Sequence, residues 1–201
     1  MINRREWGAV FAGLALPATP RLGAAESSGA AVLHVPVVAA ETGFDPAQLS
    51  DLYSLTITSH IFEALYRYDP LALPLKIVPL TAAALPEVSS DFRTWTMRLQ
   101  RAIYFAADPA FKGRRRELVA ADYVYSFKRF FDPATKSPGY SSFNEEGIVG
   151  LGALRSRALR DKAPFDYDVE VEGLRALDRY TLQIRLQAPR PRFLATLCSS
   201  A

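Results

Sequence analysis

The hydrophobic period of this chain changes along its length, and that change most constrains its fold. Arg93–Leu99 alternates apolar and polar residues, as a half-buried strand does. Ala120–Phe131 instead repeats apolar residues at helical spacing, and the helix-stopping pair Asp132-Pro133 follows it. Leu182–Leu186 alternates again. Together with 49% apolar residues, these segments predict an ordered α/β (mixed α+β) fold.

Weaker patterns extend this outline. Apolar residues between Leu52 and Tyr66 fall near helical spacing, which predicts a helix that ends before Asp69-Pro70. Val169 and Val171 form a short alternating run that could pair with Leu182–Leu186, with the turn at Asp178-Arg179. Three further elements are expected: a strand at Val32–Val38, a segment Ile103–Phe105 paired near the first alternating strand, and a helix at Phe193–Leu197.

The first 25 residues have the organisation of an export signal. Arg4 and Arg5 precede a moderately apolar run, Gly8–Ala18, and the small residues Gly23–Ala25 follow. A basic start, an apolar centre and a small-residue end are typical of a secretory signal peptide, by the Sec or the twin-arginine route. We therefore expect residues 1–25 to be removed and the mature protein to be periplasmic. The apolar run is shorter than the ~20 residues that span a bilayer.

Charge and cysteine content exclude several classes of function. Removal of residues 1–25 would take away three basic residues and one acidic residue, which reduces the formal net charge from +3 to +1. Such a balance does not provide the basic surface that nucleic-acid binding needs. Cys198 is the only cysteine, so the sequence holds neither a disulfide framework nor a cysteine zinc cluster. We expect no cofactor and no nucleic-acid partner.

Patterns for catalysis are sparse. His34 and His60 are the only histidines, and neither belongs to a metal-binding pair or accompanies a nucleophile elbow. The adjacent Glu145-Glu146 fits a solvated turn better than an acid–base pair. Lys112–Arg116, the densest basic run, is expected to be a solvated, mobile loop. Loop aromatics such as Tyr140 can either contact a ligand or fold back onto the core.

Several segments, in the same order, resemble the family 5 extracellular solute-binding proteins, the oligopeptide- and dipeptide-binding receptors of bacterial ABC importers. The most specific is Ala120–Arg129, continued by Asp132-Pro133, which is similar to the family's "T-A-x-D-V-x-Y-S-x-x-R" pattern. The other matching segments are Phe44–Pro46, Ser59–Tyr66, Leu80–Ala84, Trp95–Phe105 and Val171–Thr181.

The resemblance implies a periplasmic binding protein-like type II fold, in which two lobes close over a ligand. It implies that residues 26–62 are the first segment of lobe one and residues 63–201 an accessory subdomain, with the second lobe missing. It also implies that Ser50, Asp51 and Tyr53, after the first strand, face the ligand cleft. The aromatic loop with Tyr140 and Phe143 would face it as well.

The function implied is the periplasmic capture of oligopeptides for delivery to an ABC permease, by a monomer that is not an enzyme. Two alternatives stay open. One is a secreted hydrolase whose catalytic residues lie in a missing C-terminal half. The other is a solute-binding protein for a different ligand, such as a sugar, a metal chelate or haem.

Overall fold

The structure is a computed structural model, and it describes Pro36 and residues 39–199. All residues described from 39 onward lie in one compact unit. The signal peptide expected at 1–25 and His34 lie outside the described residues, and so does the strand expected at Val32–Val38, apart from Pro36.

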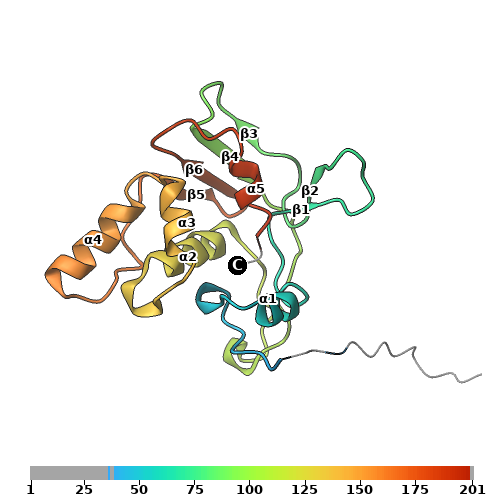
Figure 1. Cartoon of the computed structure of the whole chain (residues 1–201), viewed down its shortest axis with the longest axis horizontal. Coiled ribbons are helices and arrows are strands. Elements are labelled where there is room, and N and C mark those ends of the chain that lie inside the picture. Colours follow the sequence, from blue (N-terminus) through green and yellow to red (C-terminus); the bar gives the residue numbers. More distant parts are fainter. Residues whose placement is uncertain (1–35, 37–38, 200–201) are drawn as a thin grey trace, which may run out of the picture. The chain divides into compact units, whose positions relative to one another are not determined.

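A four-stranded antiparallel sheet organises this unit (Figure 1). Its strand order is β3-β4-β6-β5, so two strands far apart in the sequence are neighbours at its centre. Trp95 lies opposite Ile184 and Met97 opposite Leu182, and all four side chains are buried. The alternation that predicted β4 and β6 is therefore confirmed. The strands are β3 (Glu87–Val88), β4 (Thr94–Arg98), β5 (Leu174–Asp178) and β6 (Thr181–Arg185).

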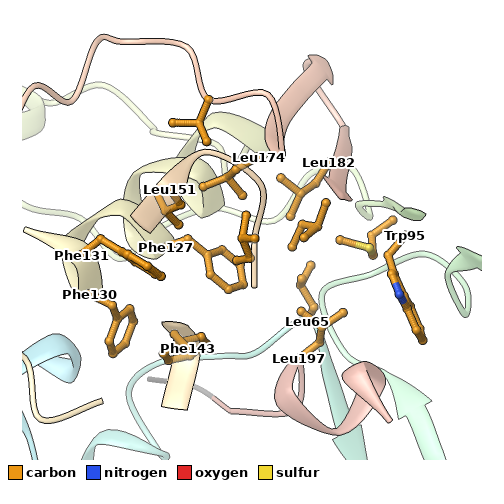
Figure 2. Close-up of a cluster of buried hydrophobic side chains, with 14 of the residues drawn as sticks. Leu65, Trp95, Phe127, Phe130, Phe131, Phe143, Leu151, Leu174, Leu182 and Leu197 are labelled. Carbon is orange, nitrogen blue, oxygen red and sulfur yellow. The ribbon is translucent and has the colours of Figure 1, made fainter. Parts of the chain in front are cut away.

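Helix α2 (Ala120–Phe131) begins and ends at the predicted residues. It packs against β5 and β6, and it directs Phe127 and Phe131 into the core that Figure 2 shows. Helices α3 (Tyr140–Glu145) and α4 (Leu151–Asp161) pack against α2 in turn. The core thus lies between one face of the sheet and this group of helices.

The helix predicted from Leu52 to Tyr66 is wrong in its second half. Helix α1 is Leu52–Thr58, and Tyr66 instead begins a strand. Three β-branched residues, 56–58, end α1, and the Thr58 hydroxyl donates a 2.8 Å hydrogen bond back to the carbonyl of Ser54. Side-chain bonds of this kind compete with helical continuation, as does the restricted rotamer freedom of β-branched residues.

A two-stranded hairpin follows α1. Strand β1 (Tyr66–Tyr68) pairs antiparallel with β2 (Ile77–Pro79). Figure 1 shows the connecting loop extending away from the helices α2, α3 and α4. The turn begins at Asp69-Pro70, the pair expected to stop the preceding element, so this stop signal was correct although the element before it is a strand.

The strand expected at Val169 and Val171 does not form. Its backbone acceptors are taken by a side chain, because the ammonium group of Lys128 donates 2.7 Å hydrogen bonds to the carbonyls of Tyr167 and Val169. Val171 makes only an isolated bridge to Leu174, at the start of β5. Lys128 is itself buried within α2, so it holds this irregular segment against the helix.

Two smaller expectations have mixed outcomes. The C-terminal helix is confirmed as α5 (Phe193–Thr196). Ile103–Phe105 does not pair with β4, because Tyr104 bridges Glu117 across the basic insertion instead. Short 3₁₀ helices complete the described chain: η1 (Pro46–Gln48), η2 (Pro109–Phe111) and η3 (Pro133–Thr135). Among the described residues, no helix has the length and apolar character to cross a membrane.

Candidate functional site

A cavity of about 680 Å³ lies beside α2. Five stretches of chain, far apart in sequence, form its walls: η1, residues 60–65, residues 103–111, α2 and residues 196–199. Thr81, Leu118 and, from α3, Phe143 complete the lining. A roomy, mainly apolar cavity with a few polar groups is the usual form of a ligand site.

Aromatic rings build the floor of this cavity. The Phe143 ring lies 5.6 Å from that of Phe127 in an edge-to-face arrangement, and 4.4 Å from that of Phe130. All three side chains are buried and belong to the core in Figure 2. Because α2 and α3 both contribute rings, packing between the two helices fixes the floor.

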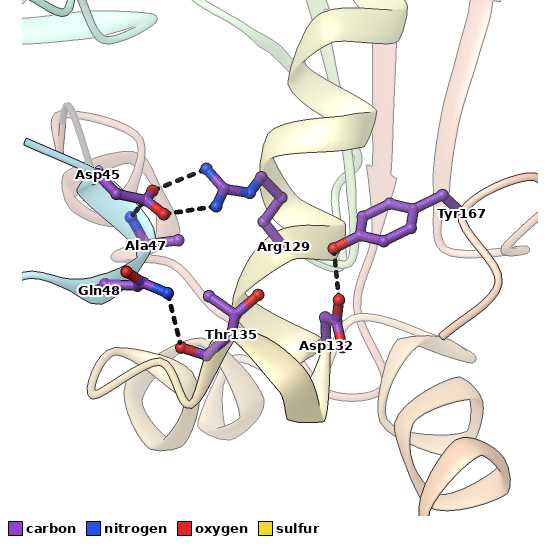
Figure 3. Close-up of polar contacts among 7 residues, drawn as sticks. All are labelled: Asp45, Ala47, Gln48, Arg129, Asp132, Thr135 and Tyr167. Atoms are coloured by element: carbon purple, nitrogen blue, oxygen red, sulfur yellow. Dashed lines mark hydrogen bonds and ion pairs between the residues drawn. The ribbon is translucent and has the colours of Figure 1, made fainter. Parts of the chain in front are cut away.

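A bidentate ion pair stabilises one wall of the cavity. The guanidinium of Arg129 on α2 donates hydrogen bonds of 2.7 and 2.6 Å to the two carboxylate oxygens of Asp45 (Figure 3). Asp45 also accepts the backbone N–H of Ala47 at 3.2 Å and thereby caps η1. The hydrogen bonds from Arg129 hold the pKa of Asp45 below its usual value, so the carboxylate stays charged. The pair fastens η1 to α2.

Figure 3 shows two further contacts near this pair. The side-chain amide of Gln48 donates to the carbonyl of Thr135 at 3.4 Å, which links η1 to η3, just after α2. The Tyr167 hydroxyl donates to Asp132 at 2.8 Å. Polar side chains therefore join η1 both to the last turn of α2 and to η3.

A neutral phenol occupies another part of the wall. The hydroxyls of Tyr123 and Thr81 lie 2.5 Å apart, and Thr81 donates on to the carbonyl of Ala64 at 2.9 Å. Burial raises the pKa of Tyr123 to about 12, so its hydroxyl is uncharged at neutral pH. The phenol can therefore serve as a hydrogen-bonding group without contributing charge.

The basic run lies behind a third side of the cavity, where Tyr104 and Phe105 belong to the lining and the run itself does not. The Arg116 guanidinium lies 4.6 Å from the ring centre of Phe105 and forms an ion pair with Asp122, which accepts the backbone N–H of Val119 at the start of α2. The Arg115 guanidinium lies 3.8 Å from the ring centre of Tyr104. Lys112–Arg115 are exposed, as expected of a solvated loop. The expectation is wrong for Arg116, which is half-buried and covers the ring of Phe105.

Ser50, Asp51 and Tyr53 lie at the start of α1, and none of them lines the cavity. Asp51 caps the helix: one carboxylate oxygen accepts the N–H of Ser54 at 2.8 Å, and the other accepts the Thr42 hydroxyl at 2.5 Å. These bonds, that from the Ser54 N–H foremost, lower the pKa of Asp51 to about 2. Ser50 is exposed and Tyr53 is half-buried.

Tyr140 and Phe143 do not lie in a loop, because they belong to the short helix α3. Phe143 is the one predicted site residue that lines the cavity. The ring of Tyr140 packs edge-to-face on Phe131 at 5.4 Å, and the guanidinium of Arg155 lies 4.1 Å above it. Tyr140 therefore stabilises the junction of α2, α3 and α4 and does not contribute to the cavity wall.

Few side chains in the described part of the chain have an arrangement that could support catalysis. His60 lies on the cavity rim, where its Nδ1 contacts the carbonyl of Thr56 at 2.8 Å and the hydroxyl of Ser59 at 3.5 Å. Between residues 39 and 199 no group of acidic, histidine or cysteine side chains is arranged to hold a metal ion. The arrangement is suited to holding a ligand against aromatic and neutral polar groups.

Sequence reasoning did not find most of the cavity. Asp45 and Arg129 were noticed only as parts of two separate motifs, and the ion pair between them spans 84 positions. No local spacing rule connects residues so far apart. The sequence signal that could have found the pair is the opposite charge of Asp45 and Arg129. It becomes informative only once the fold is known to bring η1 against α2.

Comparison with known proteins identifies the family. The family model described as "Bacterial extracellular solute-binding proteins, family 5 Middle" matches residues 76–201. Di/tripeptide-binding protein 2 of Pseudomonas aeruginosa is 28% identical over 166 residues, which are 82% of this chain and 28% of that protein. The periplasmic murein peptide-binding protein MppA of Escherichia coli is 31% identical over 151 residues, 75% of this chain and 24% of that protein.

Solved structures agree. The Escherichia coli murein tripeptide binding protein MppA matches with a TM-score of 0.59 at 29% identity, over 78% of this chain and 27% of that one. The Haemophilus influenzae OppA complex with RPPGFSPFR shows the same fold, with a TM-score of 0.61 at 24% identity, over 78% of this chain and 27% of that one. The predicted mixed α+β, periplasmic binding protein-like type II fold is confirmed for the N-terminal part that this chain covers.

The chain spans about a quarter of the length of the curated relatives it matches. The matched region includes the sheet, α2 and most of the cavity wall. The family model covers more than half of the chain, so the protein belongs to the family 5 bacterial extracellular solute-binding proteins.

Proposed function

We propose that the protein is the peptide-binding component of an ABC importer and captures oligopeptides in the periplasm for delivery to a permease. The family match carries this proposal. The names of the curated relatives support it, since they are a di/tripeptide-binding protein, oligopeptide-binding proteins and a murein peptide-binding protein. The activity belongs to a protein of the relatives' length, of which this chain supplies one part.

The cavity has properties that suit a peptide of variable sequence. Its floor is aromatic, with Phe127, Phe130 and Phe143, and such surfaces accept different apolar side chains. Two of its charged lining residues are already paired, Arg129 with Asp45 and Asp122 with Arg116, so these ion pairs exert little attraction on charged side chains of the ligand. A binding protein tolerant of sequence relies on main-chain hydrogen bonds, and roomy pockets accommodate the side chains.

We propose that the ligand face also includes the residues suggested by the resemblance. Phe143 would contact the ligand directly from the cavity floor. Ser50 and Tyr53 would contribute hydroxyl groups at the start of α1, while Asp51 would orient that helix through its cap. Tyr140 would act indirectly, because its ring supports α3 against Phe131.

Export and domain organisation are part of the same proposal. Residues 1–25 would direct the protein to the periplasm and be cleaved near Ala25. Residues 26–62 would form the first segment of lobe one, and residues 63–201 the accessory subdomain. Mass spectrometry of periplasmic material should find a chain that begins near Glu26. An intact Met1 on correctly exported protein would contradict the assignment of a signal peptide.

Calorimetry with a peptide mixture tests the function. The 201-residue chain alone should bind more weakly than about 1 mM, because each hydrogen bond made in a cleft open to water nets only about 1 kcal/mol. A chimera joins this chain to the part of Pseudomonas aeruginosa di/tripeptide-binding protein 2 beyond the matched region. It should bind peptides in the micromolar range, and Phe143→Ala should weaken binding while the exposed Phe44→Ala does not.

The competing functions are outcomes of the same experiment. Tight binding of the chimera to a sugar, a metal chelate or haem, with no response to peptides, would overturn the peptide assignment. Steady hydrolysis of the peptides would show that the protein is an enzyme, contrary to our proposal. A dimer in solution would contradict the proposed monomer.

A further inference from the structure

The tip of the β1–β2 hairpin displays three leucines to solvent. Leu71, Leu73 and Leu75 have exposed fractions of 91%, 98% and 68%. Single exposed apolar residues are common on soluble proteins, but contiguous ones mark a surface that contacts another apolar phase. The loop between β1 and β2 extends away from the helices in Figure 1, so these leucines lie on a projection of the molecule.

Few backbone N–H groups at the hairpin tip depend on water for a hydrogen bond. Pro70 and Pro74 have no N–H group. The N–H of Leu71 donates to the Asp69 carboxylate at 3.0 Å, and that of Ala72 to the Asp69 carbonyl at 3.4 Å. Four of the six residues from 70 to 75 therefore have no backbone donor left to desolvate, which lowers the cost of entering an apolar phase.

Basic residues flank the tip. Arg67 and Lys76 are exposed at its base, and Asp69, the one acidic residue between positions 67 and 80, already accepts the backbone N–H of Leu71. Tyr68, also exposed at the base, has the amphipathic ring that is enriched at bilayer interfaces. An apolar tip above basic and aromatic residues is complementary to an anionic bilayer, whose headgroups attract Lys and Arg while the acyl region takes up leucine.

We propose that the β1–β2 hairpin is a membrane-surface contact, in which Leu71, Leu73 and Leu75 enter the headgroup region of an anionic bilayer and Arg67 and Lys76 contact the lipid phosphates. This contact is reversible and shallow, since three side chains and two charges provide far less than a spanning helix. It is independent of the proposed peptide site, because the hairpin loop contributes no residue to the cavity.

Vesicle sedimentation of the chain without residues 1–25, whose basic and apolar segments would bind anionic vesicles by themselves, tests the proposal. Wild type should bind vesicles of phosphatidylglycerol mixed with phosphatidylcholine better than vesicles of phosphatidylcholine alone, and 0.5 M NaCl should weaken that preference. Leu73→Ser should lower the partition coefficient by about tenfold, and the variant with all three leucines changed to Ser by more than about 100-fold. Changing Arg67 and Lys76 to Gln should cost about fivefold per residue on anionic vesicles.

Leu159→Ser on α4 is the matched control, since this leucine is 55% exposed and lies far from the hairpin in the sequence. It should leave the partition coefficient unchanged. The hairpin leucines make no core contact, so the variants should keep the circular dichroism of wild type.

Three results would overturn the proposal. The first is the absence of wild-type binding to anionic vesicles at low salt. The second is binding that persists in the triple leucine variant, which would assign it to another surface. The third is a concentration-dependent dimer that the triple variant abolishes without any vesicle binding, because the tip would then contact a second copy of the chain.

Discussion

Replacement of Gly173 by Ala should lower the free energy of unfolding more than substitutions at exposed positions do. Gly173 sits where three backbone segments meet: it donates to the carbonyl of Val149 at 2.9 Å and accepts from the N–H of Arg185 at 2.9 Å, while Val149 donates to the carbonyl of Arg185 at 3.0 Å. A methyl group at position 173 would lie 2.4 and 2.5 Å from the backbone nitrogen and oxygen of Val149. It would also lie 2.7 Å from the backbone oxygen of Arg185.

The size of the loss in stability depends on which atoms must move to make room for the methyl group. The atoms in the way belong to the backbone, so no rotamer change relieves the clash, and overpacking of this kind costs about 1–3 kcal/mol. Separating the segments also breaks the two hydrogen bonds of Gly173, each worth about 1 kcal/mol net. The free energy of unfolding should therefore fall by about 3–5 kcal/mol.

Urea unfolding followed by the fluorescence of the buried Trp95 measures this loss. With a slope of about 2 kcal/mol per molar urea, Gly173→Ala should lower the midpoint by about 2 M. Gly43→Ala is the control, because a methyl group there meets no atom within 4 Å. It should leave the midpoint unchanged or raise it slightly. A Gly173→Ala midpoint within about 0.3 M of wild type would refute the reasoning.

Three further outcomes follow from side chains described above. Asp45→Asn should lower the free energy of unfolding by about 1 kcal/mol, a modest value because the side chains of Asp45 and Arg129 are about 30% exposed and water screens the pair. Since the folded state lowers the pKa of Asp45, this contribution is fully present above the ordinary pKa of an aspartate, 3.8, and is lost as the pH falls through the lowered pKa. Equal wild-type and variant stabilities at pH 7 would contradict it. Phe143→Ala should cost about 3 kcal/mol in urea unfolding, against no measurable change for the exposed Phe44→Ala. Burial raises the pKa of Cys198, so iodoacetamide should modify it at least about tenfold more slowly in the folded chain than in urea, and equal rates would show that the thiol is accessible.

The sequence was informative where one local pattern decides the structure. Ala120–Phe131 was predicted to the residue, because its apolar period and the following Asp132-Pro133 agree. Strands β4 and β6 were found because each has one buried face. In both cases the side chains of one element point to one core, so the burial pattern can be read directly from the chain.

Other elements depend on partners that no local pattern reveals. The strand expected at Val169 is absent because Lys128, 41 positions earlier, takes its carbonyl. The Phe143 helix has only six residues, too few for a period to show, and the preceding Pro138-Gly139 suggested a loop. The cavity is harder still to predict, because its walls come mainly from five segments between residues 46 and 199, with single residues from others. Its existence is a property of the packed fold.

The central pairing of β4 with β6 has a consequence for how this chain folds and varies. Arg98 lies opposite Thr181, and the N–H of Leu99 donates to the carbonyl of Tyr180 at 2.8 Å, so the chain returns to the place where it left the sheet. Closing such a long loop costs entropy before any contact repays it, which makes this ladder a slow, late step of folding. The loop entropy grows only with the logarithm of length, so exposed connections within residues 99–180, such as Lys112–Arg115, can lengthen or shorten at little entropic cost. Adjacent ends also make this stretch a natural unit to graft between relatives, provided that the replacement brings its own β5 to pair with β6.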